Sequence, residues 1–89
     1  MTDNEYNAIK EIKNMLVAKG FNNVKIENLG YGDEVTLDGK LTSELMDTIE
    51  ELAEDNCCDT RFGVWPFNES YDRTAISVED CSGRGYGQC

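Results

Sequence analysis

Residues 42–55 read TSELMDTIEELAED, and the spacing of the apolar side chains in this stretch predicts one helix. Apolar residues recur at intervals of three and four, which places them on one side of a helix. Those residues are Leu45, Met46, Ile49, Leu52 and Ala53. Thr42 is the expected N-cap, because its hydroxyl can accept a hydrogen bond from an unpaired amide of the first turn. Leu41 before the cap and Met46 after it are placed to form a hydrophobic staple.

A second amphipathic helix is predicted at the N-terminus. Thr2 and Glu5 have the spacing of a capping box, in which each side chain accepts a hydrogen bond from the other residue's amide. The apolar stripe that follows consists of Ala8, Ile9, Ile12, Met15 and Leu16. Gly20 should end this helix, because glycine readily adopts a positive φ, and Phe21 is placed for the hydrophobic contact of a Schellman motif.

Four stretches alternate apolar and polar residues, as half-buried strands do. They are residues 23–27, 34–38, 58–64 and 74–79, and turn-forming residues within 28–33 and 66–70 join them as two hairpins. The helix and hairpin of each half recur at an interval of about 40 residues, so that Val35 corresponds to Ile76. The fold class predicted is α+β, a two-layer sandwich of order α-β-β-α-β-β with two helices packed on one face of a four-stranded antiparallel sheet. Residues 1–81 form this single domain, and residues 82–89 form a flexible glycine-rich tail.

The net charge of −10 is concentrated in one third of the chain. Residues 27–59 carry eleven carboxylates and one cation, Lys40, whereas the seven acids and seven bases elsewhere cancel. Such a charge distribution repels nucleic acid and attracts a positively charged surface. The expected partner is therefore a protein with a basic nucleic-acid-binding groove, and neither nucleic acid nor a membrane is expected to bind directly.

The candidate binding residues are the carboxylates of this acidic band and two aromatic residues of the second hairpin. On the helix at 42–55 the carboxylates rise about 4.5–6 Å from one to the next, which is comparable to the spacing of phosphates along DNA. Aromatic side chains often anchor interfaces, although Trp65 and Phe67 could equally close the core. The partner-binding set is Asp33, Glu34, Asp38, Glu44, Asp47, Glu50, Glu51, Glu54, Asp55, Asp59, Trp65 and Phe67.

Catalysis has little support in the sequence. The chain contains no histidine, which is the commonest general base and a usual zinc ligand. We expect no catalytic residue, metal or cofactor. Cys57, Cys58, Cys81 and Cys89 lack the C-x₂₋₄-C spacing of a structural zinc site. The N-terminus shows no signal peptide, and no stretch is long and apolar enough to span a membrane, so a cytoplasmic location and free thiols are expected. A disulfide and a metal or redox switch remain alternatives.

In composition the chain is similar to small acidic inhibitors that mobile elements use against host nucleic-acid enzymes, including anti-restriction and anti-CRISPR proteins. This resemblance implies a non-enzymatic inhibitor, as found in phages, that acts as a nucleic-acid mimic and blocks the groove of a defence nuclease. The alternative is a small accessory domain whose acidity only keeps it soluble. The oligomeric state is left open.

Overall fold

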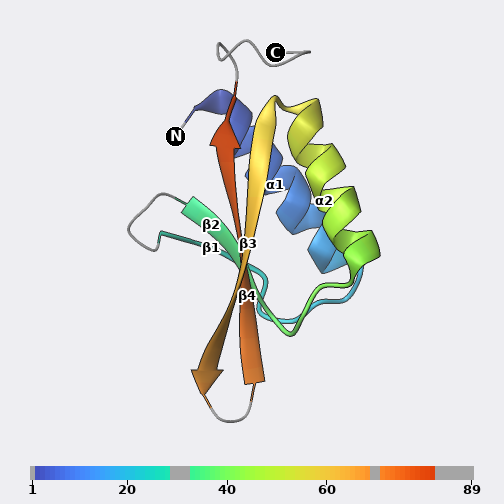
Figure 1. Ribbon diagram of the computed structural model, residues 1–89, viewed down its shortest axis with the longest axis vertical. Coiled ribbons are helices and arrows are strands. Elements are labelled where there is room, and N and C mark those ends of the chain that lie inside the picture. The colour runs from blue at the N-terminus through green and yellow to red at the C-terminus, as the bar shows by residue number, and fades with distance from the viewer. Residues whose placement is uncertain (1, 29–32, 69–70, 82–89) are drawn as a thin grey trace.

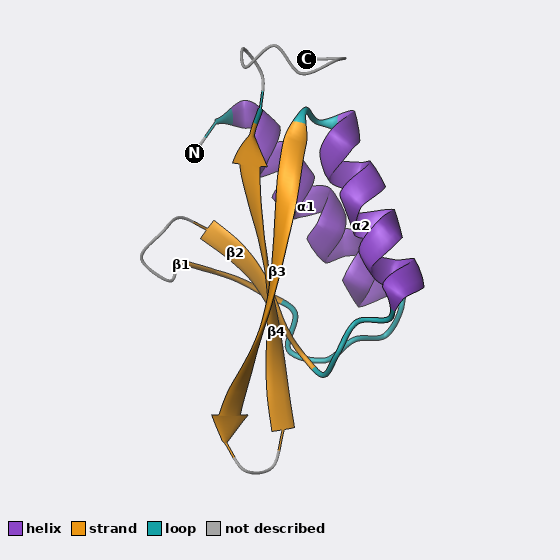
Figure 2. Ribbon diagram, viewed as in Figure 1, coloured by secondary structure: helices purple, strands orange, loops and turns teal. Residues whose placement is uncertain are grey.

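The computed structural model describes residues 2–28, 33–68 and 71–81, with side chains placed except at 28, 64–68, 71 and 72. The elements follow the order α-β-β-α-β-β, which confirms the predicted fold class. They are α1 (Asp3–Ala18), β1 (Lys25–Asn28), β2 (Asp33–Asp38), α2 (Ser43–Asp55), β3 (Cys58–Asn68) and β4 (Tyr71–Asp80), as Figures 1 and 2 show.

The four strands form one antiparallel sheet in the order β1-β2-β4-β3. Each hairpin pairs its own two strands, and the hairpins join through β2 and β4 at the centre of the sheet. Val35 of β2 lies directly opposite Ile76 of β4, so the two positions related by the 40-residue recurrence are neighbours in the sheet. This order leaves β1 and β3 as the two edge strands.

The predicted ends of both helices are confirmed. The Thr2 hydroxyl accepts a hydrogen bond from the Glu5 amide at 3.2 Å, and the Glu5 carboxylate accepts one from the Thr2 amide at 2.9 Å. At the other end of α1, Gly20 has φ +89° and the Phe21 amide donates to the Leu16 carbonyl at 3.2 Å, as in a Schellman motif. Thr42 caps α2 by accepting a hydrogen bond from the Leu45 amide at 3.2 Å.

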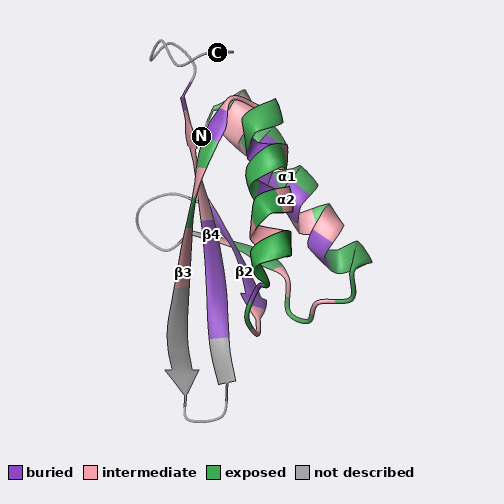
Figure 3. Ribbon diagram, turned by 45° about the vertical axis from the view of Figure 1, so that its right-hand side comes forward, coloured by how far each residue is buried: buried purple, intermediate pink, exposed green. Residues whose placement is uncertain are grey.

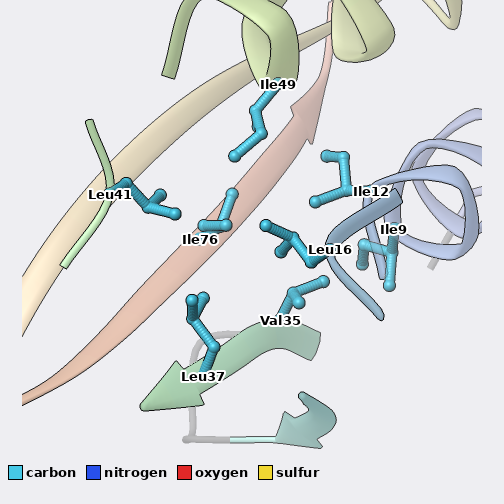
Figure 4. Close-up of a cluster of buried hydrophobic side chains, with 8 residues drawn as sticks. All are labelled: Ile9, Ile12, Leu16, Val35, Leu37, Leu41, Ile49 and Ile76. Atoms are coloured by element: carbon cyan, nitrogen blue, oxygen red, sulfur yellow. The ribbon is translucent and has the colours of Figure 1, made fainter. Parts of the chain in front are cut away.

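Both helices lie on one face of the sheet, and the core fills the space between the two layers (Figure 3). Helix α1 contacts all four strands, whereas α2 lies against α1 and β3. The main buried cluster, drawn in Figure 4, consists of Ile9, Ile12, Leu16, Val35, Leu37, Leu41, Ile49 and Ile76. Apart from Leu41, which precedes α2, these residues come from the predicted stripes of both helices and the inward positions of β2 and β4. The periodicity of the sequence therefore identified the buried faces.

The second hairpin is longer than predicted. The sequence pattern suggested that the strand ends at residue 64, but β3 continues to Asn68 and includes Trp65 and Pro66. A proline is tolerated here because β3 is an edge strand, where a missing amide need not break a ladder on both sides. The register is irregular between Pro66 and Asn68. The side chains of Trp65 and Phe67, and the predicted tail at 82–89, lie outside the described residues.

None of the helices in the described part of the chain combines the length and the apolar character needed to cross a bilayer.

Candidate acidic binding surface

The side of α2 that faces away from the core is covered with carboxylates. On a helix of 100° per residue these positions span an arc of about 140°, opposite the buried Ile49 and Ala53. All of them are exposed: Glu44, Asp47, Glu50, Glu51, Glu54 and Asp55. We call this surface the acidic face of α2. Six of the predicted binding residues are therefore brought together on one accessible surface.

The carboxylates of the acidic face are not neutralised by the protein's own cations. None of the six forms an ion pair or a side-chain hydrogen bond with any residue that the structure describes. The last turn of α2 contains no basic residue. Helix α2 has 13 residues and is therefore about 20 Å long. Six uncompensated charges along this length form an extended negative surface.

A cleft adjoins the acidic face where α2 lies beside the edge of the sheet. Its volume is about 290 Å³, and it is lined by Glu50, Glu54, Cys58, Asp59, Thr60, Arg61 and Glu79. The cleft thus combines carboxylates from α2 with others from β3 and β4. With four carboxylates and one guanidinium in its lining, it continues the negative surface of the helix onto the edge strand.

Two of the cleft carboxylates are direct cross-strand neighbours. Asp59 of β3 lies opposite Glu79 of β4. Arg61 approaches Glu79 with an Nη2–Oε2 distance of 4.0 Å, but its side chain is 83% exposed, so this ion pair is weak. Sequence reasoning missed Glu79, because it lies outside the acidic band. The hairpin register was the only signal that could have placed it beside Asp59.

The remaining predicted carboxylates lie in a different part of the molecule. Asp33, Glu34 and Asp38 belong to β2, which is separated from β3 by β4. Figure 1 shows the β1–β2 hairpin on the side of the sheet away from α2. The acidic band is therefore continuous in the sequence but divided in space between α2 with β3 and the first hairpin.

Asp38 is occupied by a contact within the protein. Its Oδ1 accepts a hydrogen bond from Arg73 Nη1 at 2.8 Å, and its Oδ2 accepts one from the side-chain amide of Asn23. Arg73 Nη2 also donates to Thr36 Oγ1 at 2.7 Å, and Thr36 in turn donates to Glu27 Oε2 at 3.0 Å. Asp38 therefore belongs to a structural network and is a poor candidate for binding a partner.

This network lies on the face of the sheet turned away from the helices, which we call the back face. Thr36 and Arg73 alternate along their strands with Val35, Leu37 and Thr74, and Val35 and Leu37 belong to the core. Thr36 and Arg73 are nevertheless buried. The back face therefore contains a buried polar row although both helices pack on the other side.

Glu34 is also on the back face, in a position unlike that of Asp38. It is only 9% exposed, and it lies opposite Glu27 of β1 and Ser77 of β4. Its carboxylate forms no hydrogen bond or ion pair with a described residue, but its oxygens still reach water, because no fully buried side-chain oxygen of the described residues lacks a partner. Burial raises the pKa of the Glu34 carboxyl, because the charged form loses solvation.

The cysteines differ from one another in state. Cys58 and Cys81 are buried and form no disulfide, as expected. Burial, followed by the charges of Asp80 and Glu5, raises the pKa of Cys58 to about 11, so its thiol stays protonated at neutral pH.

Cys57 was expected to be a free thiol, and this expectation is wrong. It precedes β3 with φ +58° and is disulfide-bonded. Left-handed backbone at this position follows from the end of α2, where the Cys57 amide donates to the Glu54 carbonyl at 2.9 Å. Within the described ranges no three acidic or thiol side chains converge as a metal site would require.

Comparison of the chain with protein-family models, with curated proteins and with solved structures finds no match.

Proposed function

We propose that this chain is a small non-enzymatic inhibitor that binds the basic nucleic-acid-binding groove of a nuclease through the acidic face of α2. The observation that carries the proposal is the set of six exposed, unpaired carboxylates along one helix. Partners of this kind are restriction or RNA-guided defence nucleases, which mobile elements need to block. Such a partner would place the activity in the cytoplasm.

The density of charge supports mimicry of a nucleic-acid strand. One strand of DNA carries a phosphate about every 3.4 Å, so a length of about 20 Å presents roughly six phosphates. The acidic face of α2 presents six carboxylates over a similar length. A groove whose lysines and arginines are arranged to neutralise phosphates can therefore neutralise these carboxylates and release counterions in the same way.

The cost of presenting these charges is small in the free protein, because all six carboxylates are exposed to water. Helix α2 is held by Ile49 and Ala53, which are fully buried and lie on the opposite side from the acidic face. The surface can therefore be altered without disturbing the core. The cleft beside β3 gives the partner a recess of about 290 Å³ next to the helix, suited to a lysine or arginine side chain.

The test compares two variants that have the same net charge. The first is Asp47→Asn with Glu51→Gln and Glu54→Gln, which removes three charges from the acidic face. The matched control is Asn7→Lys with Asn14→Lys and Ala18→Lys, which adds three positive charges at exposed positions of α1. Each variant changes the net charge by three units in the same direction, so only the position of the change differs.

The measurement is displacement of labelled duplex DNA from purified restriction and RNA-guided nucleases, followed by fluorescence anisotropy at several salt concentrations. The wild-type chain should displace DNA, and the α2 variant should do so about tenfold more weakly. The slope of the logarithm of the affinity against the logarithm of the salt concentration should be smaller by roughly two to three units, because three charges have been removed. The α1 control should retain wild-type displacement. Equal losses in both variants would mean that only net charge matters, and displacement unaffected by the α2 changes would contradict the proposal. A wild-type chain that displaces DNA from none of the nucleases would favour the accessory-domain alternative.

A further inference from the structure

The outer edge of β1 is an open edge of the sheet. In the strand order β1-β2-β4-β3, β1 pairs with β2 alone among the described strands, so part of its backbone amides and carbonyls point away from the sheet. The other edge strand, β3, contains Pro66 and an irregular register, and both features discourage pairing with a further strand. The register of β1 is regular from Lys25 to Asn28, and this strand contains no proline. The outer edge of β1 is therefore better suited than that of β3 to receive another strand.

The helical layer leaves β1 partly uncovered on the core side of the sheet. Helix α1 contacts all four strands, whereas α2 lies against β3 at the opposite edge. Ile26 of β1 is the cross-strand neighbour of Val35, which belongs to the core, so the two side chains share a face. Val35 is fully buried, but Ile26 is 43% exposed. Covering Ile26 with a further strand would remove apolar surface from water and is therefore favourable.

Two other exposed apolar side chains lie on the flank of α1 that is turned toward this edge. The opposite flank contains Glu11, whose carboxylate accepts a hydrogen bond at 2.9 Å from Asn56 at the end of α2. At about 100° per residue, Tyr6 and Val17 lie about 120–140° around the helix from Glu11. They are 56% and 54% exposed. Because α2 covers the β3 side of the sheet, these two side chains and Ile26 form an apolar border along the β1 side.

The sequence of β1 is complementary to itself in an antiparallel pair. When two copies of β1 pair about Ile26, Lys25 of each copy lies opposite Glu27 of the other. The Lys25 side chain is exposed and forms no ion pair with a described residue, and Thr36 holds the Glu27 carboxylate on the same face at 3.0 Å. A lysine on an edge strand usually discourages pairing, because its charge needs a counter-charge. A second copy supplies that counter-charge twice, so the two ion pairs favour this partner.

We propose that the outer edge of β1 binds a second copy of this chain, with the two β1 strands antiparallel about Ile26. The pairing joins the two four-stranded sheets into one and covers both Ile26 side chains. Because the two-fold axis is perpendicular to the sheet, the helices of both copies lie on the same side, and Tyr6 and Val17 border the covered isoleucines. The acidic faces of α2 lie at the two far ends of this dimer. The dimer does not depend on what those faces bind.

The test measures the mass of the purified chain by sedimentation equilibrium, from about 10 µM to about 1 mM protein. The buffer contains about 0.5 M sodium chloride, because each chain has a net charge of −10 and salt shortens the reach of the repulsion between copies. The mass should rise from that of one chain toward that of two. A mass that stays at one chain over the whole range would overturn the proposal. Assemblies larger than a dimer would also overturn it, because pairing about a two-fold axis is closed.

Exchange of the paired charges tests the register. Lys25→Glu and, separately, Glu27→Lys each place like charges opposite each other, and each should weaken the dimer by at least about fivefold. A mixture of the two variants restores opposite charges at both positions, so mixed dimers should form with about the wild-type affinity. The chain that carries both substitutions keeps the wild-type net charge and should also dimerise as the wild type does. Mixed variants that fail to associate would overturn the pairing about Ile26.

Arg61→Glu is the matched control, since it makes the same change in net charge as Lys25→Glu but on β3, the other edge strand. This variant should dimerise as the wild-type chain does. Equal weakening by Arg61→Glu and Lys25→Glu would show that net charge, and not the edge of β1, determines association. Circular dichroism shows whether each variant is folded. If Glu27→Lys is not folded, the comparison of Lys25→Glu with Arg61→Glu decides between these outcomes.

Discussion

The acidic face of α2 and the back face of β2 both carry carboxylates from the same acidic band, but in different environments. On α2 the six carboxylates are exposed, and water screens their repulsion. On β2, Asp38 is held by a buried arginine and Glu34 is buried beside Glu27. The density of charge in a sequence therefore says little about the energetic cost of each charge. Burial and the positions of the cations decide that cost.

The largest effect is expected from removing the cation of the back face. Arg73→Met should lower the free energy of unfolding by about 3 kcal/mol, because it leaves Asp38 without its counter-charge and removes the donor to Thr36. The side chains of Arg73 and Asp38 are only 9% and 26% exposed, so water cannot fully replace the lost contact. Urea denaturation monitored by circular dichroism measures the change.

Asp38→Asn serves as the companion variant. If the two side chains stabilise each other, the double variant should be less destabilised than the sum of the two single variants. A loss below about 0.5 kcal/mol for Arg73→Met would show that this network is as weak as a surface ion pair. The difference between the two regions would then disappear.

Much of the fold follows from local sequence signals. The capping box of Thr2 and Glu5, the cap at Thr42 and the glycine after α1 each depend on residues within one helical turn of each other. The alternation in β2 and β4 depends only on which face is buried. The predicted end of β3 was less accurate than the predicted helix ends, because pairing with β4 includes Pro66 in the sheet. That pairing is a tertiary effect, which local preference does not report.

The candidate site could be predicted only where one helix forms it. The carboxylates of α2 share a face because of helical periodicity, which the sequence shows directly. The separation of Asp33, Glu34 and Asp38 from that face depends on the strand order β1-β2-β4-β3. The same order brings Arg73 to Asp38 across 35 positions. No local pattern in the sequence contains these pairings.

A smaller effect is expected from the hydroxyl that connects the back-face network. Thr36→Val keeps the shape of a buried residue but removes the acceptor for Arg73 Nη2 and the donor to Glu27. The free energy of unfolding should fall by about 1.5 kcal/mol, because Arg73 and Glu27 each lose a hydrogen bond to the buried Thr36 hydroxyl. Thermal unfolding should show a decrease in Tm of roughly 6–12 °C for a domain of this size.

Thr48→Val provides a comparison on α2, where the threonine hydroxyl only donates to the Glu44 carbonyl within the helix. This control should change stability by less than about 0.5 kcal/mol. Similar losses at the two positions would indicate that the back-face hydroxyl has no special role, and would weaken the contrast between the two regions.

The smallest expected change in the free energy of unfolding comes from replacing Glu34, and it is an increase where the other variants show a decrease. Its pKa in the folded protein is raised above the ordinary value of 4.5, so the folded state binds this proton more tightly than the unfolded state does. The contribution of Glu34 to stability is therefore fully present below pH 4.5 and is lost as the pH rises through the raised pKa. Glu34→Gln cannot ionise, so at pH 7 it should be more stable than wild type by about 0.5 kcal/mol, which is the scale of a like-charge cross-strand pair.

Urea denaturation of wild type and Glu34→Gln at pH 4, 5.5 and 7 isolates this contribution, because the difference between the two proteins cancels the other carboxylates. The stabilisation by Gln should grow as the pH rises. Glu51→Gln, which removes an exposed carboxylate, corrects for the change in net charge. If Glu34→Gln instead destabilises the chain at pH 7, Glu34 has a structural partner and the two carboxylates of the back face are alike after all.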